Sequence, residues 1–576
     1  MANSLIPHPE ILSKLKLHYP ILWLLLVFNL IIILQFNSSP NRPDELWYIQ
    51  NVAAPELHLK LIFRYFHFFT AKLFSFLFHS PIDTAKAMSV IYANLIVIVA
   101  FLIGKLVSPN GGMYAAMFAM LSPTLMYQST WFGTDLSMTT FGLLSVYFCL
   151  KYIKYEQNWH LICSGFFLIA AIFSKQTGII FLAPFLLLAF IIYTSNKQRL
   201  LRVLPPFFAG FGLCFLYLSM CSLVFVGDFF YFINPQTYID FLDRFGDQLS
   251  NDSEVKVKKT PTYYSALLSS SPVSILYFVG SSFWVVLLFL PNIWRNEHTS
   301  VTRYAVIFMI TLFLCVLFLH EVFHTFYYGL KLHPRYVMPS QVCIAIAFGI
   351  LLSLLRDNFK LENRDASELS PITILGYITI TAIFLLILTN ATGASDLRQI
   401  RWIAELFTLW ASCLFVALMS YFAFTQVRDS EFRWKLFKAG LFYTFFIVLA
   451  DGIVNSKYMY DRKIYRYPVF ENAISNLEKC KSFSVTAYIE TREQVNLFEY
   501  ITGKGLLPPS TFTLFEKATQ LEIEETKIGE VDGGLTACKI VTDLTPYEHT
   551  ASDGSVWQIK NLGYSVFLVS LGVSYE

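Results

Sequence analysis

Long apolar runs alternate with short polar segments over the first 455 residues of the chain. A run of about 18 apolar residues with few charges is long enough to cross the ~30 Å hydrocarbon layer of a bilayer as a helix. The candidate spans are 20–36, 87–107, 111–127, 135–150, 160–174, 178–193, 204–226, 273–291, 304–322, 337–355, 371–390, 402–424 and 437–454. The pattern predicts an all-α polytopic membrane protein with about thirteen transmembrane helices.

The first apolar run and its flanks determine the predicted orientation. The run 19–36 is longer than the h-region of a signal peptide and no small-residue cleavage site follows it, so we interpret it as an uncleaved anchor. Lys14 and Lys16 precede it and place the N-terminus in the cytoplasm. The later short basic loops then also face the cytoplasm, whereas the longer segments 37–86 and 227–272 lie on the exterior face. We expect the functional site on that face.

The segment 61–80 is strongly aromatic but differs from the apolar runs around it. Arg64, His67 and Lys72 interrupt it, which suits a helix lying in the membrane interface better than one crossing the bilayer. The alternative is a loop plug that covers the ends of neighbouring helices.

The chain becomes polar and charged after residue 455, and alternating stretches such as 482–489 are bounded by turn residues. This change predicts two domains: a transmembrane domain over 1–455 and a small exterior α+β or β-rich domain over 456–576. Cys480 and Cys538 both lie in the second domain, and an oxidising compartment would allow them to pair.

The composition excludes several classes of protein. Hydrophobic residues make up 55% of the 576 residues and charged residues only 14%, against roughly 25% charged in a globular protein. Soluble, fibrous and disordered classes are therefore excluded. The net charge of +3 is too small to indicate a nucleic-acid partner.

Three carboxylates are the first candidates for chemistry. Asp44 and Glu45 are adjacent and lie immediately outside the first predicted span, and Asp135 opens a later span from the same side. Ionisable groups at this depth are costly and tend to be functional, and a carboxylate there can accept a proton from a hydroxyl nucleophile. The alternative is that the pair is a solvated loop and that Asp44 and Asp135 only cap helices.

Two cations are predicted near these carboxylates. Lys175 lies in an exterior turn, Phe173-Ser174-Lys175-Gln176-Thr177-Gly178, that is too short to be a free loop. Arg335 lies in Leu332-His333-Pro334-Arg335-Tyr336, immediately before a predicted span. These two residues put fixed cations near the carboxylates.

The order of these motifs resembles the GT-C membrane glycosyltransferases, in particular the dolichyl-phosphate-mannose protein mannosyltransferases and the lipid A aminoarabinose transferases. The resemblance covers roughly residues 37–350. It rests on Asp44-Glu45, Asp135, the Lys175 turn, Pro261-Thr262-Tyr263-Tyr264, and His333-Pro334-Arg335-Tyr336 with Pro339. One segment departs from the pattern: residues 57–61 read LHLKL, where relatives usually carry a Pro-Pro-Leu-like stretch.

This resemblance implies an inverting glycosyltransferase that moves a sugar from a polyprenyl-phosphate donor to an acceptor lipid, protein or polysaccharide on the exterior face. Asp44 would act as the base, Glu45 would orient the acceptor or a neighbouring basic residue, and Asp135 would help to position Asp44 or the sugar. Lys175, Arg335 and His333 are the expected cations for the donor phosphate, which needs charge stabilisation more than a general acid.

The expected setting follows from the same resemblance. No cofactor is required, and the expected location is a bacterial inner membrane, with the endoplasmic reticulum membrane as the alternative. A nucleotide-sugar donor is disfavoured because the sequence has no glycine-rich fingerprint, no Asp-x-Asp motif and no cytoplasmic domain of sufficient size.

A competing motif lies at the end of the span 304–322. His320, Glu321 and His324 match H-E-x-x-H, in which two histidines one helical turn apart bind zinc and the glutamate activates water. An intramembrane zinc metalloprotease is therefore an alternative, but no motif for an acidic third ligand is evident. The same three residues could instead bind a divalent metal or the donor phosphate within a glycosyltransferase, or satisfy one another at an interface.

A lipid-linked sugar transporter is the third alternative. Transporters commonly consist of repeated halves, and this sequence has no convincing internal repeat. The asymmetric exterior loops favour an enzyme with a site on one face.

The metal alternative has a direct test. We expect His320→Ala to retain sugar transfer, because the donor phosphate depends on cationic side chains rather than on a zinc-activated water. The measurements are metal content of the purified protein and transfer by both forms. The expectation would be contradicted if the wild type held about one zinc per chain and His320→Ala lost both the zinc and sugar transfer.

Overall fold

Helices dominate the described part of the chain, and strands begin only at Ser482. The computed structural model describes residues 9–36, 48–49, 51–52, 64–78, 80–108, 110–195, 197–233, 302–311, 334–362, 371–391, 404–426 and 430–464, the strands between 482 and 571, and a few single positions between 469 and 501. The predicted all-α transmembrane part is confirmed.

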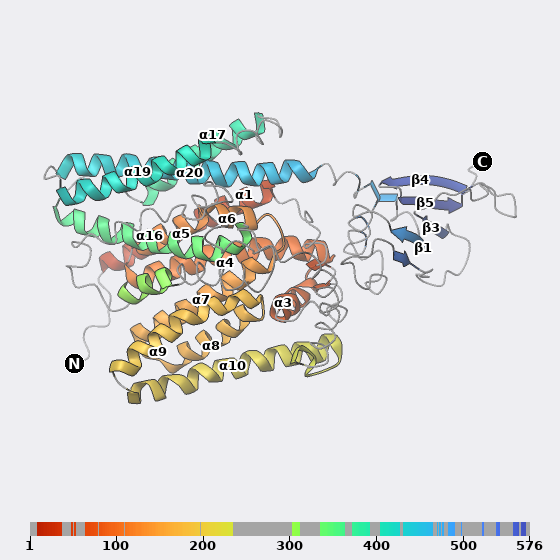
Figure 1. Ribbon diagram of the computed structural model, residues 1–576, viewed down its shortest axis with the longest axis horizontal. Coiled ribbons are helices and arrows are strands. Elements are labelled where there is room, and N and C mark those ends of the chain that lie inside the picture. The colour runs from red at the N-terminus through yellow and green to blue at the C-terminus, as the bar shows by residue number, and fades with distance from the viewer. Residues whose placement is uncertain are drawn as a thin grey trace, which may run out of the picture.

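The long helices lie side by side in one bundle (Figure 1). They are α1 (Pro9–Phe36), α4 (Pro81–Val107), α7 (Thr134–Tyr155), α8 (Asn158–Ile172), α9 (Ala183–Ser195), α10 (Lys197–Val226), α16 (Pro334–Glu362), α17 (Pro371–Ala391), α19 (Ala404–Gln426) and α20 (Ser430–Ile464). Shorter elements are α3 (Tyr65–Ser75), α5 (Gly111–Met120), α6 (Pro123–Gln128), η3 (Gln176–Leu182) and η4 (Tyr231–Ile233). Six described stretches are long and apolar enough to cross a bilayer.

Helix α16 is the centre of the bundle. Its whole apolar stretch, Met338–Arg356, is buried within the protein, and it packs against α4, α5, α6 and α7. In contrast, α10 exposes much of its apolar surface, including Leu201, Phe208 and Val224. A helix that is apolar all round is buried in protein or faces lipid, and these two helices illustrate both cases.

The apolar run 111–127, predicted as one span, is two helices in the structure. Helix α5 ends at Met120 and α6 begins at Pro123. A proline ring has no N–H and clashes with the carbonyl four residues earlier, so Pro123 starts a new helix at its first turn instead of continuing the previous one. The prediction of a single continuous helix here was wrong.

The aromatic segment 61–80 forms the short helix α3, which is packed between other helices. Its N-terminal half is buried against α4, α7, α8 and α10. Phe76 and Leu77, just beyond its C-terminus, are exposed. Most of α3 therefore acts as a plug among helices, the alternative interpretation of its sequence, and only its end has the exposure of an interfacial helix.

The C-terminal strands form one five-stranded sheet in the order β2-β1-β3-β5-β4. The strands are β1 (Ser482–Ile489), β2 (Leu521–Ile523), β3 (Ala537–Val541), β4 (Trp557–Gly563) and β5 (Val566–Leu571). Strands β1 and β3 pair in parallel, and the other pairs are antiparallel. Helix α20 continues through residue 455 to Ile464, and the proposed domain boundary and the pairing of Cys480 with Cys538 stay predictions.

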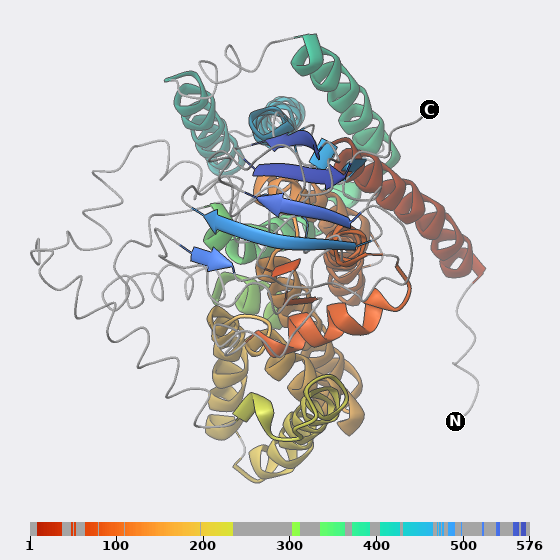
Figure 2. The same ribbon diagram turned by 90° about the vertical axis from the view of Figure 1, so that its right-hand side faces the viewer.

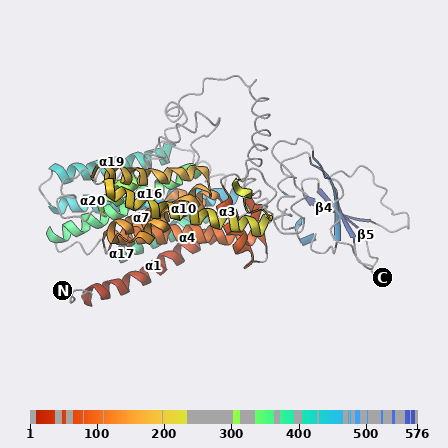
Figure 3. The ribbon, with the colours of Figure 1, turned by 90° about the horizontal axis from the view of Figure 1, so that it is seen from below.

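The sheet lies beyond one end of the helix bundle, and α3 lies at that same end (Figures 1 and 3). Helix α1 begins at the opposite end. The view along the bundle places the sheet across the helix ends (Figure 2). The two ends of the bundle thus differ, and the membrane face that each end occupies stays a prediction.

Close packing of α16 against α5 gives a test of the bundle core. A Cβ added at Gly349 would lie 2.5 Å from the backbone N and Cα of Ala115. We expect Gly349→Ala to force the helices apart and to lower stability by about 1–3 kcal/mol, the usual cost of overpacking.

The measurement is thermal unfolding in detergent. The matched control is Gly376→Ala in α17, because a Cβ there meets nothing within 4 Å. Equal melting temperatures for the two variants would contradict the packing described here.

Candidate functional site

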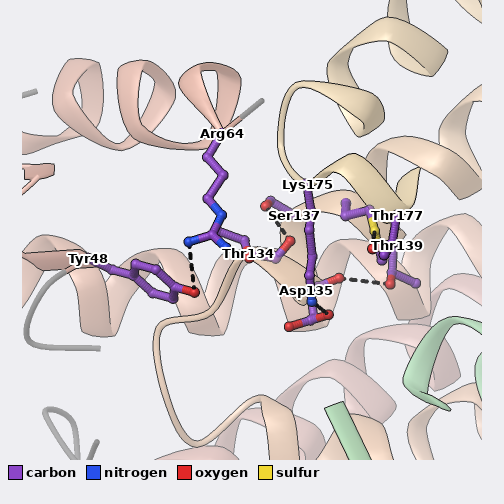
Figure 4. A network of polar contacts seen from close by, with 9 residues as sticks. Tyr48, Arg64, Thr134, Asp135, Ser137, Thr139, Lys175 and Thr177 are labelled. Carbon is purple, nitrogen blue, oxygen red and sulfur yellow. Dashed lines mark hydrogen bonds and ion pairs between the residues drawn. The ribbon is translucent and has the colours of Figure 1, made fainter. Parts of the chain in front are cut away.

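A buried ion pair is the centre of the candidate site. The Nζ of Lys175 lies 2.5 Å from Oδ1 of Asp135, and their side chains are only 8% and 4% exposed. Figure 4 shows the two side chains pointing toward each other from α7 and from the turn that follows α8. The structure therefore brings together two of the residues predicted from the sequence.

The start of α7 positions Asp135. Gly133 precedes the helix in an extended conformation, and Asp135 lies in its first turn, where a negative charge is stabilised by the free N–H groups and the helix dipole. No side chain caps this N-terminus. The carboxylate of Asp135 instead binds Lys175, so it does more than cap its own helix.

The turn after α8 positions Lys175. The backbone N–H of Lys175 donates to the carbonyl of Ala171 (3.1 Å). The hydroxyl of Ser174 donates to the carbonyl of Ala170 (2.8 Å). The element η3 begins at the next residue, so the apolar run predicted over 178–193 starts as a tight 3-10 turn. These bonds hold the lysine backbone rigidly and aim its side chain at α7.

The ion pair depends on both of its members. Removing one member of a buried ion pair typically costs about 3–5 kcal/mol, because the remaining charge loses its bonded counter-charge. The pair joins the first turn of α7 to the end of α8 through two side chains. It is therefore a structural link as well as a fixed source of charge.

A second cation, Arg64, lies at the N-terminus of α3. Its Nη1 donates to the hydroxyl of Tyr48 (3.4 Å), and its guanidinium lies 5.5 Å from the centre of that ring. The N–H of Phe66 donates to the carbonyl of Phe173 (3.0 Å), so α3 is attached to the Lys175 turn. Figure 4 shows Arg64 and Tyr48 in the same network of polar contacts as the Asp135–Lys175 pair.

His67 lies one turn after Arg64 and is fully buried. Burial, and to a smaller extent the nearby Arg64 charge, lowers the pKa of His67 to about 3. The imidazole is therefore neutral at physiological pH. Arg64 and His67 were noted in the sequence only as interruptions of an aromatic segment. That interruption was the signal that they belong to a site.

The other predicted site residues lie mostly outside the described residues. These are Asp44, Glu45, His320, Glu321, His324 and His333. Arg335 is the second residue of α16, and its side chain is likewise outside the described part. Among the described residues, no group of three or more His, Cys, Asp or Glu could hold a metal ion.

Comparison with known proteins agrees with the predicted resemblance. The model of the dolichyl-phosphate-mannose-protein mannosyltransferase family matches residues 65–224, the segment that contains Asp135 and Lys175. The match confirms the resemblance to the GT-C superfamily over this part of the chain. A search of curated proteins gives no match.

Two solved structures are similar over nearly the whole chain. ArnT from Cupriavidus metallidurans bound to undecaprenyl phosphate shares 13% identity over 96% of this chain and 98% of its own, with a TM-score of 0.47. ArnT from the same organism in the apo state shares 13% identity over 95% and 97%, also with a TM-score of 0.47.

The ion pair can be tested by a double-mutant cycle. We expect Asp135→Asn and Lys175→Met each to lower stability by about 3–5 kcal/mol, because each leaves a buried charge without its partner. The double variant should lose clearly less than the sum of the two single losses. Thermal unfolding of the purified proteins measures all three.

The matched control is Lys435→Met in the pair Glu431–Lys435 (2.6 Å), whose side chains are 74% and 68% exposed. Its loss should be less than ~1 kcal/mol, as for surface pairs in general. Additive losses at positions 135 and 175 would show that the two charges do not support each other.

Proposed function

We propose that this chain is a membrane glycosyltransferase of the GT-C type that takes a sugar from a polyprenyl-phosphate donor and transfers it, with inversion, to an acceptor on the exterior membrane face. One observation carries the proposal. The segment 65–224, which matches the mannosyltransferase family, contains the buried Asp135–Lys175 pair. Helix α3, which is hydrogen bonded to the Lys175 turn, lies at the end of the bundle where the sheet lies.

The charge arrangement suits a lipid-linked donor. A polyprenyl phosphate is already a good leaving group, and the negative charge that develops on it must be stabilised by preorganised cations. Lys175 is such a cation, because its backbone is held in a turn and its ammonium group is held by Asp135. Arg64 adds a second cation from the α3 side, and its bond to Tyr48 restrains its side chain.

The proposed roles divide between the two sides of the sugar. Lys175, Arg335 and His333 bind the donor phosphate. Asp44 accepts the proton of the acceptor hydroxyl from the opposite face of the sugar, which gives inversion, and Glu45 orients the acceptor. The role proposed for Asp135 is to hold Lys175 in place.

The proposed donor class is that of the matching family, in which mannose is carried on dolichyl phosphate, itself a polyprenyl phosphate. The sugar is therefore mannose or a related hexose. The acceptor is a lipid, a protein or a polysaccharide that reaches the exterior face of the bilayer. No resident cofactor takes part in the proposed reaction.

Asp44→Asn tests the proposed mechanism. Loss of a general base typically costs 10²–10⁴-fold in rate, and we expect a loss of about this size with unchanged expression and melting temperature. The assay follows sugar transfer from a panel of polyprenyl-phosphate sugars, and the anomeric configuration of the product shows whether the reaction inverts.

The matched control is Asp83→Asn, an exposed carboxylate in the first turn of α4 that bonds only locally to Ser80 among the described residues. It should transfer at the wild-type rate. Wild-type turnover in Asp44→Asn would remove this residue from the mechanism, and a retained configuration would contradict the inverting reaction.

A further inference from the structure

Three buried polar groups near the ion pair have no hydrogen-bond partner among the described residues. They are both ring nitrogens of His67, the hydroxyl of Tyr92 and the hydroxyl of Thr134. These side chains come from three different elements: α3, α4 and the start of α7. Buried polar atoms are almost always paired with protein or with bound water, so a group of unpaired ones requires an explanation.

Ring contacts bring His67 and Tyr92 together. The His67 ring stacks on Phe132, with centroids 4.5 Å apart, and on Tyr92, with centroids 6.0 Å apart. Phe132 lies in the segment that leads into Thr134 and Asp135, and Phe66, the neighbour of His67, is hydrogen bonded to the Lys175 turn. His67 and Tyr92 therefore pack against the segments that carry Asp135 and Lys175.

These polar atoms are costly to the folded protein. Burial of a polar group without a hydrogen bond costs about 1–3 kcal/mol, and the surrounding rings would pack equally well against phenylalanine. Packing alone would favour an apolar residue at both positions. Because His67 and Tyr92 also pack against the segments that carry the charged groups of the candidate site, their polar atoms are expected to serve a bound group.

The chemistry of that group follows from what the side chains offer. A neutral imidazole has one donor and one acceptor, and a tyrosine hydroxyl can do both. This set matches an alcohol, which also donates once and accepts, and it is a poor match for an anion, which only accepts. The cations Arg64 and Lys175 nearby are better suited to the phosphate.

We propose that His67 and Tyr92 form a hydrogen-bonding subsite for a substrate hydroxyl. The proposal rests on the proposed function, since a sugar transferase brings both a hydroxyl-rich donor and a hydroxyl acceptor to this end of the bundle. His67 is fully enclosed in this structure, so the incoming hydroxyl displaces part of the side-chain cover. His67 and Tyr92 bind and orient the substrate, and no bond forms or breaks at either residue.

The variants His67→Phe and Tyr92→Phe test the subsite because each keeps the aromatic ring and removes the polar atoms. We expect about a tenfold loss in transfer efficiency for each, the loss of roughly one hydrogen bond, with a melting temperature equal to or above that of the wild type. If the subsite binds a hydroxyl of the donor sugar, the variants should raise the KM for the donor. If it binds the acceptor hydroxyl, they should raise the KM for the acceptor.

His160→Phe is the matched control. His160 is also buried, in α8, and both of its nitrogens also lack a partner among the described residues. It lies at the start of α8, whereas Lys175 follows the end of that helix, a separation of about 20 Å along its axis. His160→Phe should leave both KM values and kcat unchanged.

A second measurement is independent of turnover. Polyprenyl-phosphate mannose and polyprenyl phosphate alone are added separately, and the rise in melting temperature is measured for the wild type and for His67→Phe. If the subsite binds a donor hydroxyl, polyprenyl-phosphate mannose should raise the melting temperature of the wild type more than polyprenyl phosphate does, and this difference should be absent in His67→Phe. If it binds an acceptor hydroxyl, the wild type and His67→Phe should respond equally to the two lipids, and only the KM for the acceptor should rise.

The outcomes separate this proposal from the proposed function. If kcat, both KM values and the melting responses of His67→Phe all equal those of the wild type, the unpaired atoms bind only internal water. That result would overturn the subsite. If the wild type transfers no sugar from any polyprenyl-phosphate donor, the proposed function fails. Without sugar transfer there is no acceptor reaction, so the subsite can then hold only a hydroxyl of the lipid-linked sugar. The melting responses to the two lipids decide this, and equal responses of both proteins to both lipids would overturn the subsite.

Discussion

The buried ion pair between Asp135 and Lys175 is the interaction on which the rest of the site depends. A buried charge is costly unless it is paired, so the pair keeps the first turn of α7 against the turn after α8. A backbone hydrogen bond from Phe66 to Phe173 attaches helix α3 to the turn after α8. The positions of Arg64 and His67 therefore follow from the same pair.

This dependence matters for the proposed sugar transfer. Water cannot reorganise around a developing charge inside a packed helix bundle, so the stabilising groups must be oriented beforehand. Lys175 is oriented by Asp135, and Arg64 is restrained by Tyr48. Neutral polar groups such as His67 and Tyr92, which pack against the segments that carry these charges, offer hydrogen bonds of a different kind. The site thus combines fixed cations with neutral donors and acceptors.

Some of these features could be predicted residue by residue. Asp135 and Lys175 were identified because a charge at the end of an apolar run is costly and lies at a predictable membrane face. Arg64 and His67 were not, because their importance lies in contacts with residues far away in the sequence. The break between Met120 and Pro123 was also missed, although the proline carried the signal, because hydropathy averages over a break of two residues.

The sequence by itself determined the class of the protein, since length and hydropathy decide whether a segment can cross a bilayer without help from the rest of the chain. It also determined which few charges are candidates, because ionisable residues are rare in such segments. Only the tertiary structure decided that Asp135 binds Lys175 and that α3 is a buried plug. Pairing and burial are set by which helix faces meet, and hydropathy along one helix does not specify its neighbours.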